Sequence, residues 1–125
     1  MIDPSLDPEV YARLARERGW TIRHVLDTHI HADHLSRSRL LCERTGARLF
    51  LPTQQRVKFP HESLVDGTEI RFGQAALRAL QTPGHTLESM SYRVEDRWLL
   101  TGDTLFLAGV GLPDLEAGAN RCAVS

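Results

Sequence analysis

The 125-residue sequence lacks the features that mark membrane and nucleic-acid-binding proteins. Its longest apolar stretches, at 98–100 and 105–110, are far shorter than the roughly 20 residues that a membrane-spanning helix needs. No charge dominates either, because 15 Lys and Arg oppose 16 Asp and Glu. Electrostatic attraction to nucleic acid or to an acidic membrane is therefore not expected.

The sequence also has few cysteines, and we do not expect a secretory signal at its N-terminus. The two cysteines, Cys42 and Cys122, are too few for a disulfide framework. The N-terminus carries Asp and Pro where a secretory signal would have basic and then apolar residues. We therefore expect a cytoplasmic protein.

The first half of the chain has the pattern of a parallel β-α-β unit. Val10 and Leu14 recur at helical spacing after Pro8, and Gly19 predicts the end of that helix. Residues 21–28 are typical of a buried strand, 35–45 of a helix that Gly46 ends, and 47–51 of a second strand. Two strands joined through a helix form a parallel crossover.

The second half has a different texture. Residues 52–66 show no periodicity and are predicted to be loop. Short segments at 69–72, 75–81, 89–94 and 97–100 are separated by turn residues, which favours an antiparallel meander. A single domain of the α/β class, with mixed sheets flanked by helices, is therefore expected.

Four metal-ligand side chains crowd the segment after the first predicted strand. They are His29, His31, Asp33 and His34. In extended chain, alternate side chains project to one side, so His29, His31 and Asp33 can converge while His34 reaches round at the turn. Convergent imidazoles and carboxylates bind divalent first-row metals.

Two later residues could complete such a site. His85 lies in the turn Pro-Gly-His-Thr, and Asp103 follows the strand at 97–100 in Thr-Gly-Asp-Thr. Either motif alone is weak, since turns commonly hold His and Asp. Each would nevertheless supply one ligand from a different strand end, as a shared metal site requires.

These motifs together resemble the metallo-β-lactamase-fold superfamily. The resemblance rests on His-x-His-x-Asp-His, on the Gly-His turn and on Thr-Gly-Asp, and it covers residues 2–115. The sequences Thr-His-x-His-Ala-Asp-His-Leu-Ser and Gly-x-Gly-x-Pro-Asp-Leu look most like the persulfide dioxygenase and rhodanese-associated branch, with glyoxalase II as a near relative. The fold that this resemblance implies is an αββα sandwich.

The resemblance also implies ligands, cofactors and substrates. A first metal would be bound by His29, His31 and His85, and a second by Asp33, His34 and a bridging Asp103. In iron-dependent persulfide dioxygenases a single ion suffices, and its ligands correspond to His29, His85 and Asp103. Catalytic roles are expected for Asp33, His29, His85 and Asp103. The resemblance thus implies an enzyme that uses one or two Fe²⁺ or Zn²⁺ ions on a small thiol-derived substrate, either oxidising a persulfide or hydrolysing a thioester.

Three departures from the family pattern favour another alternative, a catalytically silent truncated remnant. No histidine follows His85, and Leu112 stands where the family has arginine. The chain is also short for the family. We expect an incomplete domain at 1–115, without the N-terminal strands and C-terminal elements, and an irregular tail at 116–125. Such a chain could associate as a homo-oligomer.

Overall fold

The computed structural model describes residues 1–31 and 37–112. Its elements, in chain order, are α1 (Pro8–Glu17), β1 (His24–Leu26), α2 (Ser38–Thr45), β2 (Arg48–Pro52), β3 (Glu62–Leu64), β4 (Glu69–Phe72), β5 (Ala75–Gln81), β6 (Met90–Val94), β7 (Trp98–Leu100), the 3-10 turn η1 (Gly102–Thr104), β8 (Leu105–Phe106) and β9 (Gly109–Val110). No helix in the described ranges has the length and apolar character needed to cross a bilayer.

Helix α1 begins and ends as its sequence predicts. The Asp7 carboxylate accepts a hydrogen bond of 2.8 Å from the Glu9 amide, and Pro8 occupies the first helical turn, where its missing N–H costs nothing. Buried Ala12 and Ala15 form its inner face. The helix ends just before Gly19, so the predicted helix is confirmed.

The predicted parallel crossover is also confirmed. Strands β1 and β2 pair in parallel, with His24 opposite Arg48, and α2 connects them. Gly46 ends α2 in the left-handed conformation, with φ of 73°. Strand β1 is shorter than the predicted 21–28 because its register with β2 covers only three residue pairs.

One strand was missed within the region predicted as loop. β3 pairs in parallel with β2, with Phe50 opposite Glu62. The Arg48 guanidinium also binds the Glu62 carboxylate across this pair. A three-residue strand is defined mainly by its partner, so its own sequence carries too little pattern to reveal it.

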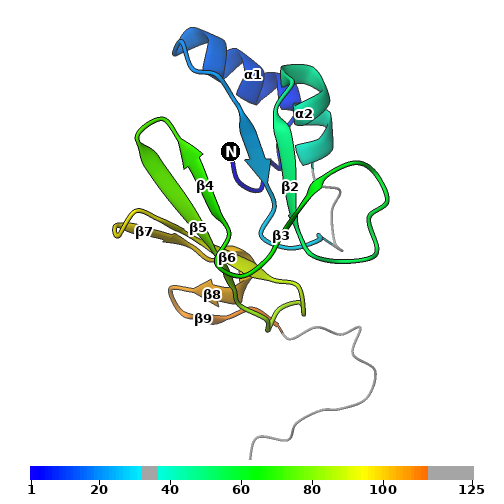
Figure 1. Cartoon of the computed structure of the whole chain (residues 1–125), viewed down its shortest axis with the longest axis vertical. Coiled ribbons are helices and arrows are strands. Elements are labelled where there is room, and N and C mark those ends of the chain that lie inside the picture. The colour runs from blue at the N-terminus through cyan, green and yellow to red at the C-terminus, as the bar shows by residue number, and fades with distance from the viewer. Residues whose placement is uncertain (32–36, 113–125) are drawn as a thin grey trace, which may run out of the picture.

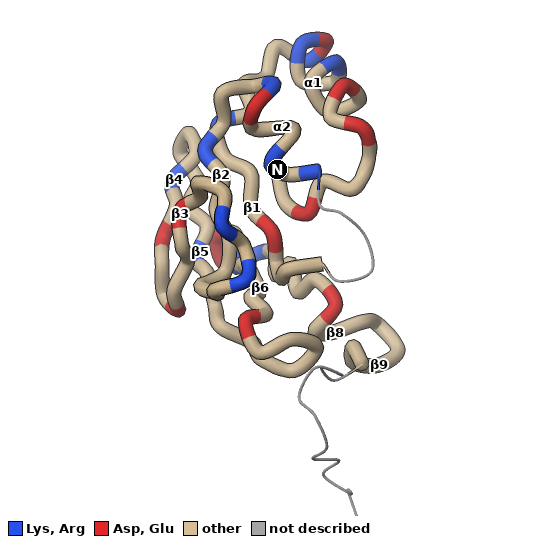
Figure 2. The backbone as a smooth tube through the Cα atoms, turned by 90° about the vertical axis from the view of Figure 1, so that its right-hand side faces the viewer, with Lys and Arg blue, Asp and Glu red and all other residues tan. Residues whose placement is uncertain are grey.

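The predicted meander is present as the sheet β4-β5-β6-β7, antiparallel throughout. β4 and β5 have the predicted bounds, and β6 and β7 each begin one residue later than predicted. A small β8–β9 hairpin follows, which the sequence did not predict. In both backbone views this hairpin and the two helices lie at opposite ends of the molecule (Figures 1 and 2).

Two apolar clusters hold three layers together. One lies between the helices and the first sheet and includes Val25, Leu41 and Leu51. The other lies between the two sheets and includes Leu26 and Tyr92. The described residues thus form a helix-sheet-sheet arrangement, which agrees with the expected α/β class and with part of an αββα sandwich.

Candidate metal centre

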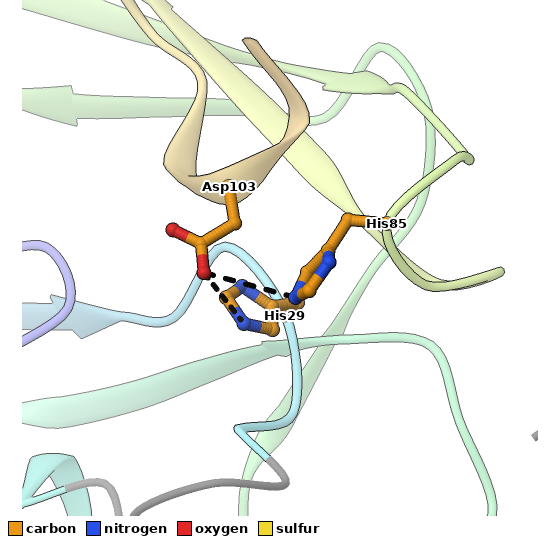
Figure 3. A group of neighbouring side chains, drawn as sticks. All are labelled: His29, His85 and Asp103. Atoms are coloured by element: carbon orange, nitrogen blue, oxygen red, sulfur yellow. Dashed lines mark ion pairs between the residues drawn. The ribbon is translucent and has the colours of Figure 1, made fainter. Parts of the chain in front are cut away.

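Three loops bring one ligand-type side chain each to the same place. His29 follows β1, His85 lies in the β5–β6 connection and Asp103 lies in η1 after β7 (Figure 3). The Asp103 Oδ2 atom is 4.0 Å from His29 Nε2 and 3.7 Å from His85 Nε2. One ligand atom of each side chain lies within 4.8 Å of the other two.

These separations suit a first-row divalent ion. Zinc–ligand bonds to His nitrogen and carboxylate oxygen are about 2.0–2.2 Å, so two ligands of one ion can be at most roughly 4.3 Å apart. Both distances to Asp103 fall within that reach. The Asp103 carboxylate is therefore close enough to each imidazole to share an ion with it, and all three ligand atoms lie within 4.8 Å of one another.

His29 is the buried member of the group, with 3% of its surface exposed. Its Nδ1 atom is 3.0 Å from the Thr28 hydroxyl. Burial, and then the neighbouring His31 ring, lower the pKa of His29 below the ordinary imidazole value. The ring is consequently neutral at physiological pH, which is the form that binds metals.

His85 is oriented by the backbone. Its Nδ1 atom lies 2.8 Å from the Leu112 carbonyl oxygen. Because a carbonyl only accepts hydrogen bonds, Nδ1 carries a hydrogen, and in the neutral ring Nε2 presents its lone pair towards Asp103. Any residue at position 112 can supply this carbonyl, so Leu112 retains this contact although it lacks the guanidinium of arginine.

Two glycines let the Asp103 turn approach its neighbours closely. A Cβ atom at Gly111 would collide with the carbonyl oxygen of Asp103, and one at Gly102 would collide with the side chain of Thr28. Gly102 also has a φ of 52°, in the left-handed region. Both positions therefore need glycine to hold Asp103 near the two imidazoles.

The comparisons with known proteins identify the fold. A family model described as the metallo-beta-lactamase superfamily matches residues 1–124. The chain belongs to the metallo-β-lactamase superfamily. It is 40% identical over 114 residues to a hydroxyacylglutathione hydrolase of Rhodospirillum rubrum and 36% identical to that of Pseudomonas entomophila, covering 89% of this chain in each case. It spans 44% of the length of both relatives.

Solved structures of the superfamily agree. A metallo-beta-lactamase from Staphylococcus aureus superimposes with a TM-score of 0.81 and 32% identity, over 91% of this chain and 38% of that protein. ETHE1 from Myxococcus xanthus superimposes with a TM-score of 0.78 and 39% identity, over 88% of this chain and 48% of that protein. The expected partial metallo-β-lactamase sandwich is therefore confirmed.

Of the other sequence-predicted ligands of this metallo-β-lactamase domain, His31 lies within the described residues. The His31 ring lies beside that of His29, with ring centroids 4.2 Å apart and the ring planes tilted by 53°. Its Nε2 atom, however, lies 3.5 Å from Asp3 Oδ1, so it belongs to a second group formed by Asp3, Asp27 and His31. Asp33 and His34 lie outside the described residues.

Asp3 is a residue that sequence reasoning missed. The Asp3-Pro4 pair has the pattern of a turn, and nothing local indicates its contact with residues 25 or more positions away. Burial alone would raise the pKa of Asp3, but hydrogen bonds from His31 and Thr28 outweigh it and lower the pKa below the ordinary value. Asp3 is therefore a carboxylate at neutral pH.

Proposed function

We propose that this chain binds one divalent metal ion through His29, His85 and Asp103 and acts on a small thiol-derived molecule, oxidising a persulfide. The supporting observation is the convergence of the two imidazoles of His29 and His85 and the carboxylate of Asp103. A two-histidine, one-carboxylate set with open positions is typical of non-haem iron oxygenases. Iron bound there would supply the redox chemistry with dioxygen.

The side chains of the site differ in their exposure to solvent, which indicates the side from which a substrate would approach. Asp103 has 48% of its side chain exposed and His85 28%, whereas His29 is enclosed. The substrate would therefore approach over Asp103 and His85. Because Leu112 has no charge, an anionic substrate would find no guanidinium at that position, which favours weak substrate binding.

Thioester hydrolysis is the second candidate, and the names of the curated relatives favour it. Hydroxyacylglutathione hydrolases share 36–40% identity with the chain. Zinc in such sites supplies a water activated at neutral pH. Under this alternative, we propose that His31 joins His29 and His85 at one ion, and that Asp33 and His34 bind a second ion bridged by Asp103.

Oxygen consumption separates these candidates. The chain would be purified without a nickel column, analysed for bound metals, and given either glutathione persulfide or a hydroxyacylglutathione thioester. We expect about one iron per chain and oxygen uptake with the persulfide. Thioester cleavage without oxygen uptake would contradict the dioxygenase proposal and support the hydrolase.

The silent-remnant alternative needs its own measurement. A chain that binds metal but turns over neither substrate would contradict both enzymatic proposals. Leu112→Arg extends the test, because it introduces the guanidinium that the family pattern has at this position. A large gain in rate would support a weakened enzyme, whereas no rate in either form would support the remnant.

A further inference from the structure

A chain of hydrogen bonds leads from Asp3 through Thr28 to His29. The Thr28 hydroxyl donates to Asp3 Oδ2 over 2.8 Å, and the Thr28 amide donates to Asp3 Oδ1 over 2.7 Å. The same hydroxyl oxygen is 3.0 Å from His29 Nδ1. Asp3 is itself anchored, because its amide donates to the Leu26 carbonyl over 2.9 Å.

The number of hydrogens fixes the direction of this chain. A carboxylate has none, so the single hydroxyl hydrogen of Thr28 points at Asp3. Towards His29 the hydroxyl can only offer a lone pair, and Nδ1 must therefore carry the hydrogen. A neutral imidazole has one N–H, which leaves Nε2 bare and facing Asp103.

The surroundings keep water away from these hydrogen bonds. Thr28 is 1% exposed and His29 3%. The η1 turn closes over the hydroxyl, since a side chain at Gly102 would collide with it. Neither the hydroxyl nor Nδ1 therefore has a solvent partner that could reverse the hydrogen bonds.

We propose that Asp3 and Thr28 are positioning residues that hold His29 in the tautomer with a bare Nε2, ready to bind a metal. The expected effect on metal binding rests on the proposed function, whereas the tautomer of His29 does not depend on it. The neighbouring His31 also contacts Asp3, so substitutions must separate the two contacts. Substitutions at Thr28 separate them, because the contact with the His29 ring is made by the Thr28 hydroxyl, whereas the contact with the His31 ring is made by Asp3.

The first experiment reads the tautomer in the metal-free chain. Multiple-bond ¹H–¹⁵N correlation spectra of ¹⁵N-histidine-labelled protein distinguish Nδ1–H from Nε2–H rings. We expect Nδ1–H for His29 in the wild type and in Thr28→Ser, which keeps the hydroxyl. Thr28→Val removes it and should produce a mixture of tautomers. An unchanged His29 signal in Thr28→Val would overturn the proposal.

Asp3→Asn gives a sharper result because it should reverse the direction of the hydrogen bonds that run through the Thr28 hydroxyl. The Thr28 amide requires the oxygen of the asparagine amide, so its NH₂ group must face the Thr28 hydroxyl. The hydroxyl would then donate to His29 Nδ1 and leave the hydrogen on Nε2. We expect a predominantly Nε2–H ring for His29. Retention of Nδ1–H in a folded Asp3→Asn variant would contradict the proposed series of hydrogen bonds from Asp3 through Thr28 to His29.

Metal affinity gives the second readout. Loss of an outer partner of a metal-binding histidine typically weakens affinity by about 10–100-fold, and we expect that loss in a Zn²⁺ competition titration of Thr28→Val. Thr28→Ser should bind within about threefold of the wild type by the same reasoning. Wild-type affinity in a folded Thr28→Val would overturn the positioning role. A wild type without Zn²⁺ affinity would instead contradict the proposed function. The tautomer measurement would then test the positioning role of Asp3 and Thr28 by itself.

Discussion

The N-terminal half and the antiparallel sheet present their ligands in opposite environments. Strand β2 is buried at four of its five positions, because helices cover one face of its sheet and the second sheet covers the other. Strand β7 is exposed at all three positions. The ligand after β1 is accordingly enclosed, whereas Asp103, which follows β7, lies at the rim. Packing encloses one side of the site, and the other side is open to solvent.

The difference arises because, among the described residues, β7 is the last strand of its sheet and pairs with β6 on one side only. In the register of β6 and β7, Tyr92 lies opposite Leu100, yet Tyr92 is fully buried and Leu100 is 37% exposed. A groove of about 1250 Å³ lies at this edge, between that sheet and a wall formed by α1 and residues 19–24, and Leu100 is part of its lining. Substitutions in the two regions should therefore have graded effects.

The largest stability loss is expected in the covered region. Leu41 lies on α2, fully buried against the first sheet. Leu41→Ala should lower the free energy of unfolding by about 2–5 kcal/mol, because it removes buried carbon atoms and leaves a cavity. Urea denaturation followed by circular dichroism measures the change. A loss below about 1 kcal/mol would mean that α2 does not cover this face as the structure has it.

Thiol reactivity should show the same coverage without any substitution. Burial, followed by the nearby Asp27 charge, raises the pKa of the Cys42 thiol to about 11 from the model-peptide value of 9.0. Only the thiolate is alkylated, so at pH 8 the reaction should be about a hundredfold slower than for a free thiol and should accelerate as pH rises towards 11. Peptide mapping after iodoacetamide treatment measures it. Equal rates in native protein and in urea would refute the coverage.

A smaller loss is expected where the two regions meet. The buried Tyr92 hydroxyl donates to the Asp27 carbonyl over 2.5 Å, which ties β6 to the end of β1. Tyr92→Phe leaves that carbonyl without this donor and should cost about 1–3 kcal/mol. Thermal unfolding would detect it, and an unchanged melting temperature would show that the tie contributes nothing.

The smallest effect is expected on the open side. Leu99 is 55% exposed on β7. Leu99→Ala should change the free energy of unfolding by less than about 0.5 kcal/mol, as is usual for surface positions. The same urea measurement applies. A loss of unfolding free energy comparable to that of Leu41→Ala would mean that Leu99 is buried in solution, and it would contradict the contrast between the two regions.

Local patterns predicted most of the elements but few of the contacts between them. Helix α1, the parallel crossover and the meander follow from periodicity and from Gly and Pro punctuation. β3 escaped prediction because its partner strand defines it. The grouping of His29, His85 and Asp103 could be anticipated because each ends a predicted strand, but the contact of Asp3 with Thr28 depends on tertiary packing alone.

The meeting of His29, His85 and Asp103 around one cation is tested most directly by metal titration of single variants. Zn²⁺ binding would be measured for the chelator-treated chain and for His29→Ala, His85→Ala and Asp103→Ala. His61→Ala is the matched control, because His61 lies in the loop before β3 and contacts the Phe59 carbonyl. We predict tight binding in the wild type and in His61→Ala, and a loss of more than about 100-fold in each of the other three. Wild-type affinity in any of those three variants, or no affinity in the wild type, would contradict a shared metal site.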